Sequence, residues 1–294
     1  MSSPLISVII AVYNTDQYIS QAVDSVLAQS WENIELIIVN DGSTDNTQKE
    51  LDKYLGDERV RVLSTCNNGQ PKAKNIGIKN SRGQFIGFCD ADDFWLPRKL
   101  EQQMSAFVNP LIGVVYSDVF HIDEAGNDIY IEKTQTCKSG KITDSLIIKN
   151  YIPFGTALVR RECFETSGLF DESLPMGIDW DLWLRYSMDW EFYYLPEKTY
   201  VYRVWGGQMS SNFRGRYEYA LRILKKFIET YPNAVPPSVQ NRAWSDMYVS
   251  RGMSVASSDK SFFEPLKDLL AGLRHDWTYK SAWKSMAKLL LRRV

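Results

Sequence analysis

The sequence predicts an α/β fold, with a mostly parallel central sheet flanked by helices and a C-terminal helical extension. Three observations predict it. Apolar, β-branched runs alternate with segments of helical periodicity through the first hundred residues. The links between them are short, as in the strand–helix–strand units that build parallel sheets. After Gly206 and Gly207 the pattern stays helical to the end of the chain.

The elements are expected in the following order. The run 6–12 is continuously apolar, which is typical of a strand buried on both faces. A polar turn at 14–16 then precedes a helix with apolar residues at helical spacing from Ile19 to Leu27. Further strands are expected at 34–39, 60–63, 85–89, 113–117, 156–160, 192–195 and 199–204. Further helices are expected at 72–80, 97–107, 161–167, 180–188 and 213–228.

The polar stretch 118–140 is expected to be a hairpin or a long loop. We expect a main domain over 1–212, composed of a half at 1–110 and a half at 111–212, and a helical region at 213–294.

Composition limits the class of protein. The 294 residues are 44% hydrophobic and 24% charged, which are ordinary globular values, and a net charge of -2 argues against a nucleic-acid partner. No apolar stretch reaches the about 18 residues that span a bilayer, and the start of the sequence lacks the basic region of a signal peptide. Four scattered cysteines without a CxxC pair fit reduced thiols rather than zinc ligands. A cytoplasmic location is expected.

An acidic cluster is the main candidate for a site. Asp90, Asp92 and Asp93 directly follow the apolar strand 85–89. Such a concentration of charge is costly unless a cation or a donor-rich ligand shares it, so a divalent metal holding a phosphorylated substrate is one interpretation. An acidic turn before a helix cap is the other. Polar residues also follow the first two strands, and the carboxyl ends of parallel strands bind ligands.

Other common sites are not supported. The chain has neither a GxGxxG fingerprint nor a P-loop, and His121 and His275 are too few for a histidine-rich metal site or a convincing Ser–His–Asp triad. Asp41, in VNDGSTD, is either a turn residue or an acceptor for the N–H of a nucleobase ring. Lys74, in a segment that begins at Gly69, belongs either to a plain helix start or to a diphosphate contact.

Five motifs in order closely resemble the inverting family 2 glycosyltransferases of GT-A fold. They are VIIAVYN, VNDGSTD, Gly69 with the following AKNIG, DADD, and GIDWDLW. The resemblance runs from about residue 5 to residue 211 and leaves the helical tail uncovered.

The resemblance implies roles for matching positions. Residues that bind the nucleotide sugar are implied to be Ala11, Tyr13, Asp41, Lys74, Asp90, Ala91 and Asp92. Among them, Ala11, Tyr13 and Asp41 match the nucleobase site, Asp90 points toward the ribose, and Asp92 holds Mg²⁺ or Mn²⁺ and the diphosphate. Lys74 stands where many relatives carry Arg, so it offers a point charge rather than a planar fork. Asp179 matches the general base.

Two positions depart from the pattern. Ile178 stands where an acidic residue usually precedes the base, and Trp205 stands where many relatives carry a histidine that ligates the metal. An indole cannot ligate, so we expect weaker, nucleotide-dependent metal binding. Asp181 either compensates for Ile178 or simply caps the helix or faces solvent; the second is favoured. Trp180 is a candidate acceptor contact or a core residue, as is Trp183.

The resulting expectation is a metal-dependent inverting transferase that moves a sugar, UDP-linked, to an acceptor hydroxyl during synthesis of a cell-surface polysaccharide or lipid-linked glycan. The alternatives are a nucleotide-sugar-binding partner subunit without catalysis, and a nucleotidyltransferase, in which Asp179 would have no task.

The end of the chain carries one further expectation. In 281–294, Lys284, Lys288 and Arg292 share one helical face, while Trp283, Ala287, Leu290 and Val294 share another. This is either a basic amphipathic helix on the inner, anionic membrane surface or a helix packed on the domain with a solvated basic face.

Overall fold

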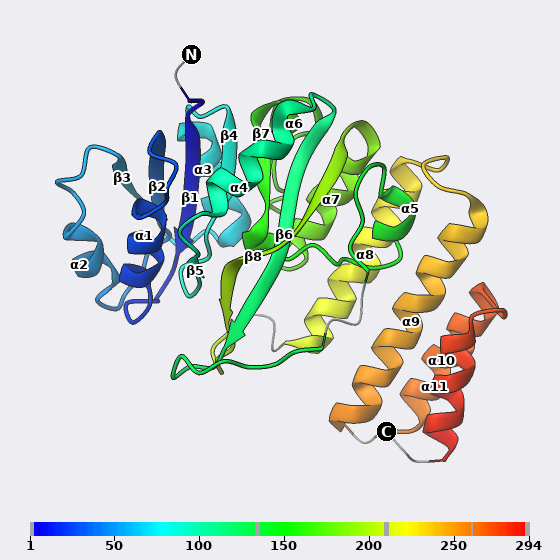
Figure 1. Ribbon diagram of the computed structural model, residues 1–294. Coiled ribbons are helices and arrows are strands. Elements are labelled where there is room, and N and C mark those ends of the chain that lie inside the picture. The colour runs from blue at the N-terminus through cyan, green and yellow to red at the C-terminus, as the bar shows by residue number, and fades with distance from the viewer. Residues whose placement is uncertain (1–2, 133–135, 209–211, 260, 292–294) are drawn as a thin grey trace. The chain divides into compact units, whose positions relative to one another are not determined.

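The computed structural model describes residues 3–132, 136–208, 212–259 and 261–291 (Figure 1). The chain forms two compact units. Unit 1 comprises 1–141, 151–175 and 189–206, and unit 2 comprises 142–150, 176–188 and 207–294. The expected domain division at residue 212 stays a prediction.

Unit 1 is built on one sheet of eight strands within the described residues. The strands are β1 (Ile6–Val12), β2 (Ile34–Asn40), β3 (Val60–Ser64), β4 (Phe85–Phe88), β5 (Phe94–Trp95), β6 (Ile112–Ile122), β7 (Leu158–Arg160) and β8 (Glu191–Arg203). Their order is β3-β2-β1-β4-β7-β6-β8-β5. The β1–β2, β2–β3, β1–β4 and β6–β8 pairs are parallel, and β7 and β5 pair antiparallel to their neighbours. The predicted mostly parallel sheet is therefore confirmed.

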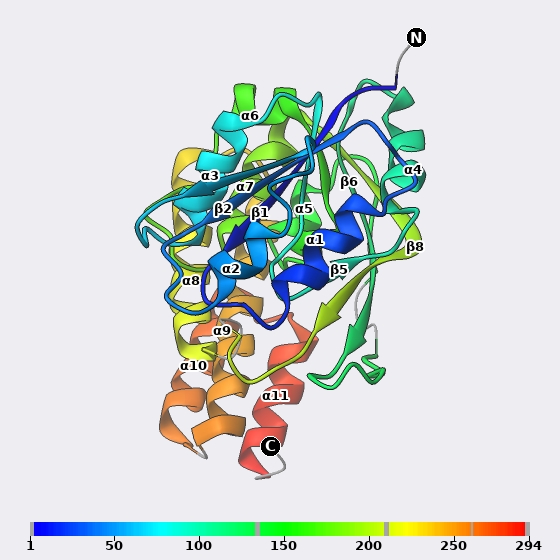
Figure 2. The ribbon, with the colours of Figure 1, turned by 90° about the vertical axis from the view of Figure 1, so that its left-hand side faces the viewer.

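Helices cover both faces of this sheet (Figure 2). They are α1 (Ile19–Leu27), α2 (Thr47–Asp52), α3 (Gln70–Asn80), α4 (Lys99–Met104) and α6 (Arg161–Ser167), with 3₁₀ turns at Ser105–Val108 and Phe154–Thr156. Alternate residues of β1, such as Ile6 and Ile10, share a core with Val23 of α1. The opposite face carries α3, where a Cβ on Gly77 would lie 2.5 Å from Ile9 Cγ2. Only glycine permits so close a helix–strand approach.

Unit 2 is helical. Its helices are α5 (Thr143–Leu146), α7 (Ile178–Asp189, whose last residue belongs to unit 1), α8 (Phe213–Thr230), α9 (Pro237–Asp259), α10 (Phe263–His275) and α11 (Lys280–Leu290). The last three share a small core centred on the buried Leu269, Ala282 and Leu289. Among the described residues, no helix has both the length and the apolar character needed to cross a bilayer. Arg292 and Val294, expected on the faces of the last helix, lie outside the described residues.

Two expectations about strands were incomplete. The expected strands 192–195 and 199–204 form one strand, β8, and β6 continues five residues into the expected loop, to Ile122. The two strands pair with a register shift: Ser117 faces Leu195, whereas Asp118 faces Lys198. The two extra residues, Pro196 and Glu197, therefore lie in a bulge, where a proline without an N–H is tolerated.

Candidate active site

In unit 1, the loops after β1 and β2 are fastened to each other. Asn14, with a φ of 51°, receives a hydrogen bond from Thr44 N to its Oδ1 (2.7 Å), and its own N–H donates to Ser43 Oγ (3.0 Å). Asparagine tolerates this left-handed conformation better than most residues. Tyr13 beside it is 47% exposed, so its ring is accessible at the carboxyl end of β1. Ala11, which lies within β1 and is also expected to contact the nucleobase, is half-buried.

Asp41 lies directly after β2, at the same carboxyl edge of the sheet. Its carboxylate is buried and accepts hydrogen bonds from two backbone amides, Asn68 N (3.0 Å) and Gly69 N (2.8 Å). Neither is within its own turn, so these bonds do not favour the alternative of a local turn residue. Asp41 instead holds the segment before α3 against the end of β2. A carboxylate has about four lone-pair sites, so these two bonds leave capacity for a ring N–H.

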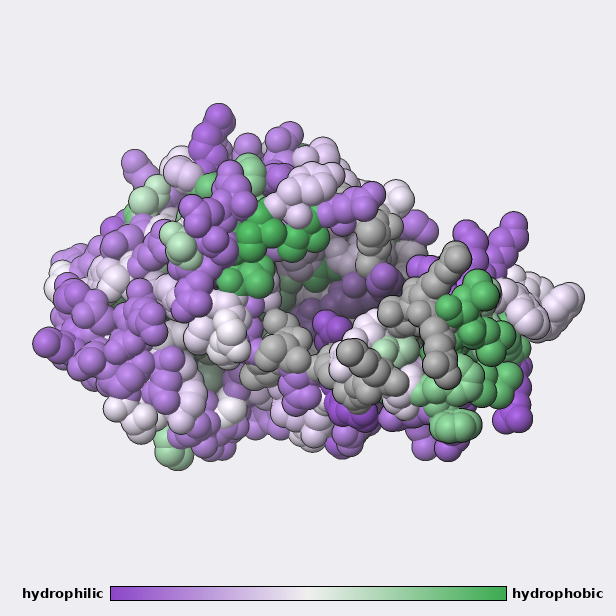
Figure 3. Space-filling model, turned by 90° about the horizontal axis from the view of Figure 1, so that it is seen from below, coloured by the Kyte–Doolittle hydropathy of each residue, from purple (hydrophilic) through white to green (hydrophobic). Residues whose placement is uncertain are grey.

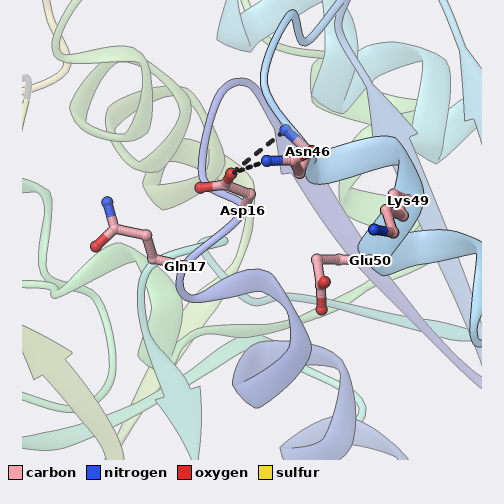
Figure 4. Close-up of a pocket in the computed structure, with 5 residues that line it drawn as sticks. All are labelled: Asp16, Gln17, Asn46, Lys49 and Glu50. Atoms are coloured by element: carbon pink, nitrogen blue, oxygen red, sulfur yellow. Dashed lines mark hydrogen bonds between the residues drawn. The ribbon is translucent and has the colours of Figure 1, made fainter.

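A shallow polar pocket lies beside these loops (Figure 4). It has a volume of about 340 Å³ and is lined by Asp16, Gln17, Asn46, Lys49 and Glu50. Asp16 Oδ2 accepts bonds from both the backbone and the side-chain nitrogen of Asn46, each at 3.3 Å. The pocket therefore lies between the β1–α1 turn and α2. None of the residues expected to bind the nucleotide sugar lines it.

The acidic loop after β4 is paired with the lysine of α3. Lys74 is buried, and its Nζ donates to Asp90 Oδ1 at 2.8 Å. The same ammonium lies 4.0 Å from the ring centroid of Phe154, in cation–π range. The structure therefore brings together two residues that the sequence placed 16 positions apart, one expected at the ribose and one at the phosphates. Ala91 between the aspartates is buried.

Asp93 is the structural member of the cluster. Its buried carboxylate accepts a bond from Tyr200 OH (2.8 Å) and from Arg203 N (2.8 Å). The same Tyr200 hydroxyl receives the Asp90 N–H at 3.3 Å. Burial, together with the charges of Asp92 and Asp90, raises the pKa of Asp93 well above its usual range. The end of β8 thereby fixes the shape of the acidic loop.

Asp92 has a different set of partners. Trp205 Nε1 donates to Asp92 Oδ2 at 2.8 Å, and Arg203 Nε donates to the Asp92 carbonyl at 3.1 Å. Arg203 is itself buried, with its guanidinium carbon 4.6 Å from the ring centroid of Tyr18 and its Nη2 bonded to Gln21 (2.6 Å). Trp205 cannot ligate a metal, but it orients the carboxylate that is expected to do so.

The side chains of the acidic loop suit a hard cation that takes most of its ligands from substrate phosphates and water. No group of three or more His, Cys, Asp or Glu side chains in the described part of the chain could hold a metal. Asp90 bonds Lys74, Asp93 bonds Tyr200 and Arg203, and Asp92, the carboxylate that the resemblance assigns to the metal, is oriented by Trp205. Mg²⁺ commonly accepts one carboxylate, substrate phosphates and water. The residues therefore fit a cation brought in with a nucleotide diphosphate.

In unit 2, Asp179 lies in the first turn of α7. Gly177 precedes the helix with a φ of 71°, and a Cβ there would lie 2.8 Å from Ile223 Cδ1 of α8. The positive φ favours glycine at this position, and a Cβ would also have to displace the end of the Ile223 side chain. Asn150 Nδ2 donates to Asp179 Oδ2 at 2.7 Å, so the half-buried carboxylate is held in one orientation.

Asp181 does not face solvent, and that expectation was wrong. It is 4% exposed and accepts bonds from Arg185 Nε (3.0 Å) and Nη2 (2.9 Å) on one oxygen. Lys226 Nζ of α8 donates to the other oxygen at 2.8 Å. The buried carboxylate thus joins α7 to α8 by charge-assisted bonds.

The two tryptophans beside Asp179 are core residues. Trp180 is 5% exposed and its Nε1 donates to Leu146 O at 2.8 Å, while Trp183 is fully buried. Burial favours the core role for both over an acceptor contact. Ile178 is buried as well, so an apolar side chain suits the position of the missing acidic residue.

Sequence reasoning missed four residues of these sites: Asn150, Tyr18, Tyr200 and Arg203. Tyr200 and Arg203 lie five and two positions before Trp205, so this spacing was the available signal. Asn150 lies between α5 and the 3₁₀ turn at Phe154–Thr156, among mostly apolar neighbours, and carries no local signal. Met209 and Ser210, near the end of the stretch over which the resemblance runs, lie outside the described residues.

Solved structures share the fold. The chain superposes on S. aureus TarS with a TM-score of 0.69 over 92% of this chain and 49% of that chain, at 17% identity. TarS has also been crystallised in complex with UDP-GlcNAc. The mannosyltransferase PcManGT from Pyrobaculum calidifontis, in complex with GDP-Man and Mn²⁺, matches with a TM-score of 0.58 over 100% of this chain and 89% of that chain, at 16% identity.

Sequence relatives are closer. An uncharacterized glycosyltransferase of Rickettsia felis is 36% identical over 188 residues, which cover 62% of this chain but 31% of that protein. One of Rickettsia prowazekii is 35% identical over 215 residues, which cover 71% of this chain and 67% of that protein. The family described as "Glycosyl transferase family 2" matches residues 7–168. The chain therefore belongs to glycosyltransferase family 2 and has the GT-A fold that its motifs predicted.

Proposed function

We propose that this glycosyltransferase moves a sugar from a UDP-linked donor to an acceptor hydroxyl, with inversion and with the help of a divalent cation. One observation carries the proposal: Asp92, next to the Lys74–Asp90 pair at the carboxyl end of β4, is oriented by Trp205. The complex of TarS with UDP-GlcNAc supports a uridine donor, and that of PcManGT with GDP-Man makes guanosine the competing choice.

On the donor side, the proposal assigns the base to the edge formed by Ala11, Tyr13 and Asp41. The accessible ring of Tyr13 offers a stacking surface, and the fixed carboxylate of Asp41 offers an acceptor for a base N–H. Asp90 and Ala91 lie toward the ribose. Lys74 is the cation within reach of the diphosphate, and binding of the donor would redistribute its bond to Asp90.

Asp92 would hold Mg²⁺ or Mn²⁺ together with the donor's phosphate oxygens. When bound, this cation supplies neutralisation of the charge that develops on the departing diphosphate. Trp205 and Arg203 keep the Asp92 carboxylate and its backbone in place through the bonds described above. A carboxylate held by such contacts needs little reorganisation when the donor arrives.

On the acceptor side, Asp179 is the proposed general base. The acceptor oxygen attacks the anomeric carbon, the bond from that carbon to the diphosphate oxygen breaks, and the hydroxyl proton passes to Asp179. Asn150 holds the carboxylate for this transfer. Such general-base help is typically about 10²–10⁴-fold. A single displacement of this kind inverts the anomeric configuration. We further propose a saccharide of a cell-surface polysaccharide or a lipid-linked glycan as the acceptor.

The test is a panel of UDP-GlcNAc, UDP-glucose, UDP-galactose and GDP-mannose, each with Mn²⁺ or with EDTA. Thermal unfolding measures binding, because a donor at 100 times its dissociation constant stabilises the protein by about 2.7 kcal/mol. Release of the nucleoside diphosphate measures turnover, and the anomer first released into water is read by proton NMR. A uridine donor should stabilise the protein only with metal, and the released sugar should be inverted.

Asp179→Asn should lose turnover and keep donor binding, whereas Asp92→Asn should lose metal-dependent binding. Asp144→Asn, an exposed carboxylate of α5, is the matched control and should change neither. Retention of configuration, or full stabilisation in EDTA, would refute the mechanism. Donor binding by the wild type without any turnover on a panel of acceptors would favour a non-catalytic partner subunit.

A further inference from the structure

The helix α11 in unit 2 has three distinct faces. At 100° per residue, Ala282, Ser285, Met286 and Leu289 occupy one side of the helix. All four are buried, and three of them belong to the core shared with α9 and α10. This buried face fastens the helix to its unit. The apolar stripe predicted from the sequence is a different face, so packing on the unit does not account for it.

That second face is apolar and exposed. Trp283 (54% exposed) and Leu290 (60% exposed) share this face with the small, exposed Ala287, and the exposed Leu291 (63%), which caps the helix, follows at its edge beside the lysines. An isolated exposed leucine is ordinary, but three large exposed apolar side chains on one short helix and its cap are not. Figure 3 shows hydrophobic residues gathered over the C-terminal helices on the face seen from below.

The third face is basic. Lys280, Lys284 and Lys288 are exposed and lie directly beside the apolar stripe on the helical projection. From residue 280 to residue 294 the sequence has five basic and no acidic side chains. The stripe and the lysines together are called the basic-apolar face below: Lys280, Trp283, Lys284, Lys288, Leu290 and Leu291.

The neighbouring segments have the same character. Trp277, in the turn before α11, is 74% exposed, and its carbonyl receives the Trp283 indole N–H at 2.8 Å. On α10, Phe263 (82% exposed) and Leu270 (46% exposed) share one face at i, i+7, with the exposed Lys267 between them.

We propose that the basic-apolar face of α11 docks on an anionic lipid surface. The lysines would lie at the phosphate level, and Trp283, Leu290 and Leu291 would enter the headgroup region, where tryptophan is favoured. Charge decides between occupants. A second copy of this chain would bring like-charged faces together, whereas anionic lipid complements them. The proposal is independent of the proposed function and concerns where the enzyme is held, not its chemistry.

The experiment is co-sedimentation of the full chain with vesicles of phosphatidylcholine alone or with 30 mol% phosphatidylglycerol (about one anionic lipid in three, as in charged leaflets). The wild type should bind the anionic vesicles only, and added salt should weaken binding because exposed charges are screened. Replacing Lys280, Lys284 and Lys288 together by Gln should weaken binding on the order of a hundredfold. Replacing Trp283, Leu290 and Leu291 together by Ser should also weaken it.

Matched control variants distinguish an effect of the basic-apolar face from a general effect of losing exposed lysines or exposed apolar side chains. Lys79, Lys138 and Lys225, all exposed, are replaced together by Gln, and Val108 and Leu111, 87% and 60% exposed, by Ser. Both controls should bind vesicles as the wild type does. All substituted side chains are exposed, so every variant should keep the wild-type unfolding temperature and the wild-type donor binding.

Three results would overturn the proposal. The wild type could fail to bind anionic vesicles. The two face variants could bind as well as the controls. Finally, sedimentation velocity could show a dimer that the serine variant dissociates, without vesicle binding, in which case the face joins two copies of the chain.

Discussion

Asn150 donates a hydrogen bond of 2.7 Å to Asp179, and this contact sets the orientation of the carboxylate that we propose as the general base. Asn150→Ala removes the hydrogen-bond donor to Asp179 and should lower kcat by about 10- to 100-fold, since a hydrogen bond to a charged group is worth about 1.5–3 kcal/mol. The KM for the nucleotide sugar should stay nearly unchanged. Steady-state kinetics measure both constants.

Asn150→Asp is the informative companion, because it places a second carboxylate at the same site and repels Asp179. It should be less active than Asn150→Ala if the bond orients a charged base. Equal activity of the wild type and Asn150→Ala would show that the contact is only structural.

The Trp205–Asp92 bond predicts a change in metal requirement. Trp205→Phe removes the indole N–H but keeps an aromatic ring near Tyr18, whose centroid lies 5.6 Å from that of Trp205. The Mn²⁺ concentration for half-maximal activity should rise about tenfold, as for other partners that orient a metal ligand. Trp190→Phe removes an indole N–H elsewhere in unit 1 and should leave it unchanged. An unaltered metal titration in Trp205→Phe would dissociate this residue from metal binding.

The buried carboxylate of Asp181 predicts an asymmetry in stability. Asp181→Leu leaves Arg185 and Lys226 without their shared partner, and breaking a buried ion pair costs about 3–5 kcal/mol. Lys226→Met should cost under about 1 kcal/mol, because that side chain is 42% exposed and its charge is largely solvated. Urea unfolding compares the two variants. Equal losses would mean that the pair is not buried in solution.

Lys99 predicts a pH dependence of stability. This lysine of α4 is fully buried, donates to Gln103 Oε1 (2.7 Å) and Thr156 O (2.6 Å), and burial lowers its pKa from 10.5 to about 7. Between pH 7 and pH 10.5 the unfolded chain therefore binds a proton that the folded protein lacks. Stability should rise with pH in this window, by up to about 1.4 kcal/mol per pH unit.

Lys99→Met should remove this rise, and Lys79→Met, at an exposed lysine, should retain it. The free energy of unfolding in urea, measured from about pH 7 to about pH 9 for the three proteins, tests this. The difference between wild type and Lys99→Met cancels the opposing effect of Cys163, whose thiol pKa burial raises; the effect of Cys89 does not cancel, because its pKa also depends on the charge of Lys99. A constant difference across the range would contradict the prediction.

The parallel half of the sheet was predictable because its strands are continuous β-branched runs. β1 has the predicted bounds, and α6 likewise begins and ends where expected. The strand prediction from the sequence was incomplete where a strand contains a bulge. The predicted strands 192–195 and 199–204 left a gap at 196–198, which includes Pro196, and the pairing that carries β6 and β8 past this gap joins residues that are some 80 positions apart. Two-residue β5 has no periodicity to detect.

The acidic cluster was visible because three carboxylates follow an apolar strand, but its internal division of roles was not. Asp93 is buried only because Tyr200 and Arg203 return to it from positions more than 100 residues later. Asp181 looked solvent-exposed because its partner Lys226 lies on another helix. Burial and long-range pairing of charged residues depend on tertiary contacts, for which local sequence patterns carry no signal.

The reach of β8 has a practical consequence for dissecting this protein. The family match stops at residue 168, yet the side chains that hold the acidic loop arrive between Tyr200 and Trp205. A fragment cut at the end of the match would leave three neighbouring carboxylates without the hydroxyl, amide and indole donors that offset their mutual repulsion. Truncated versions meant to isolate nucleotide binding should therefore retain the chain through Gly206.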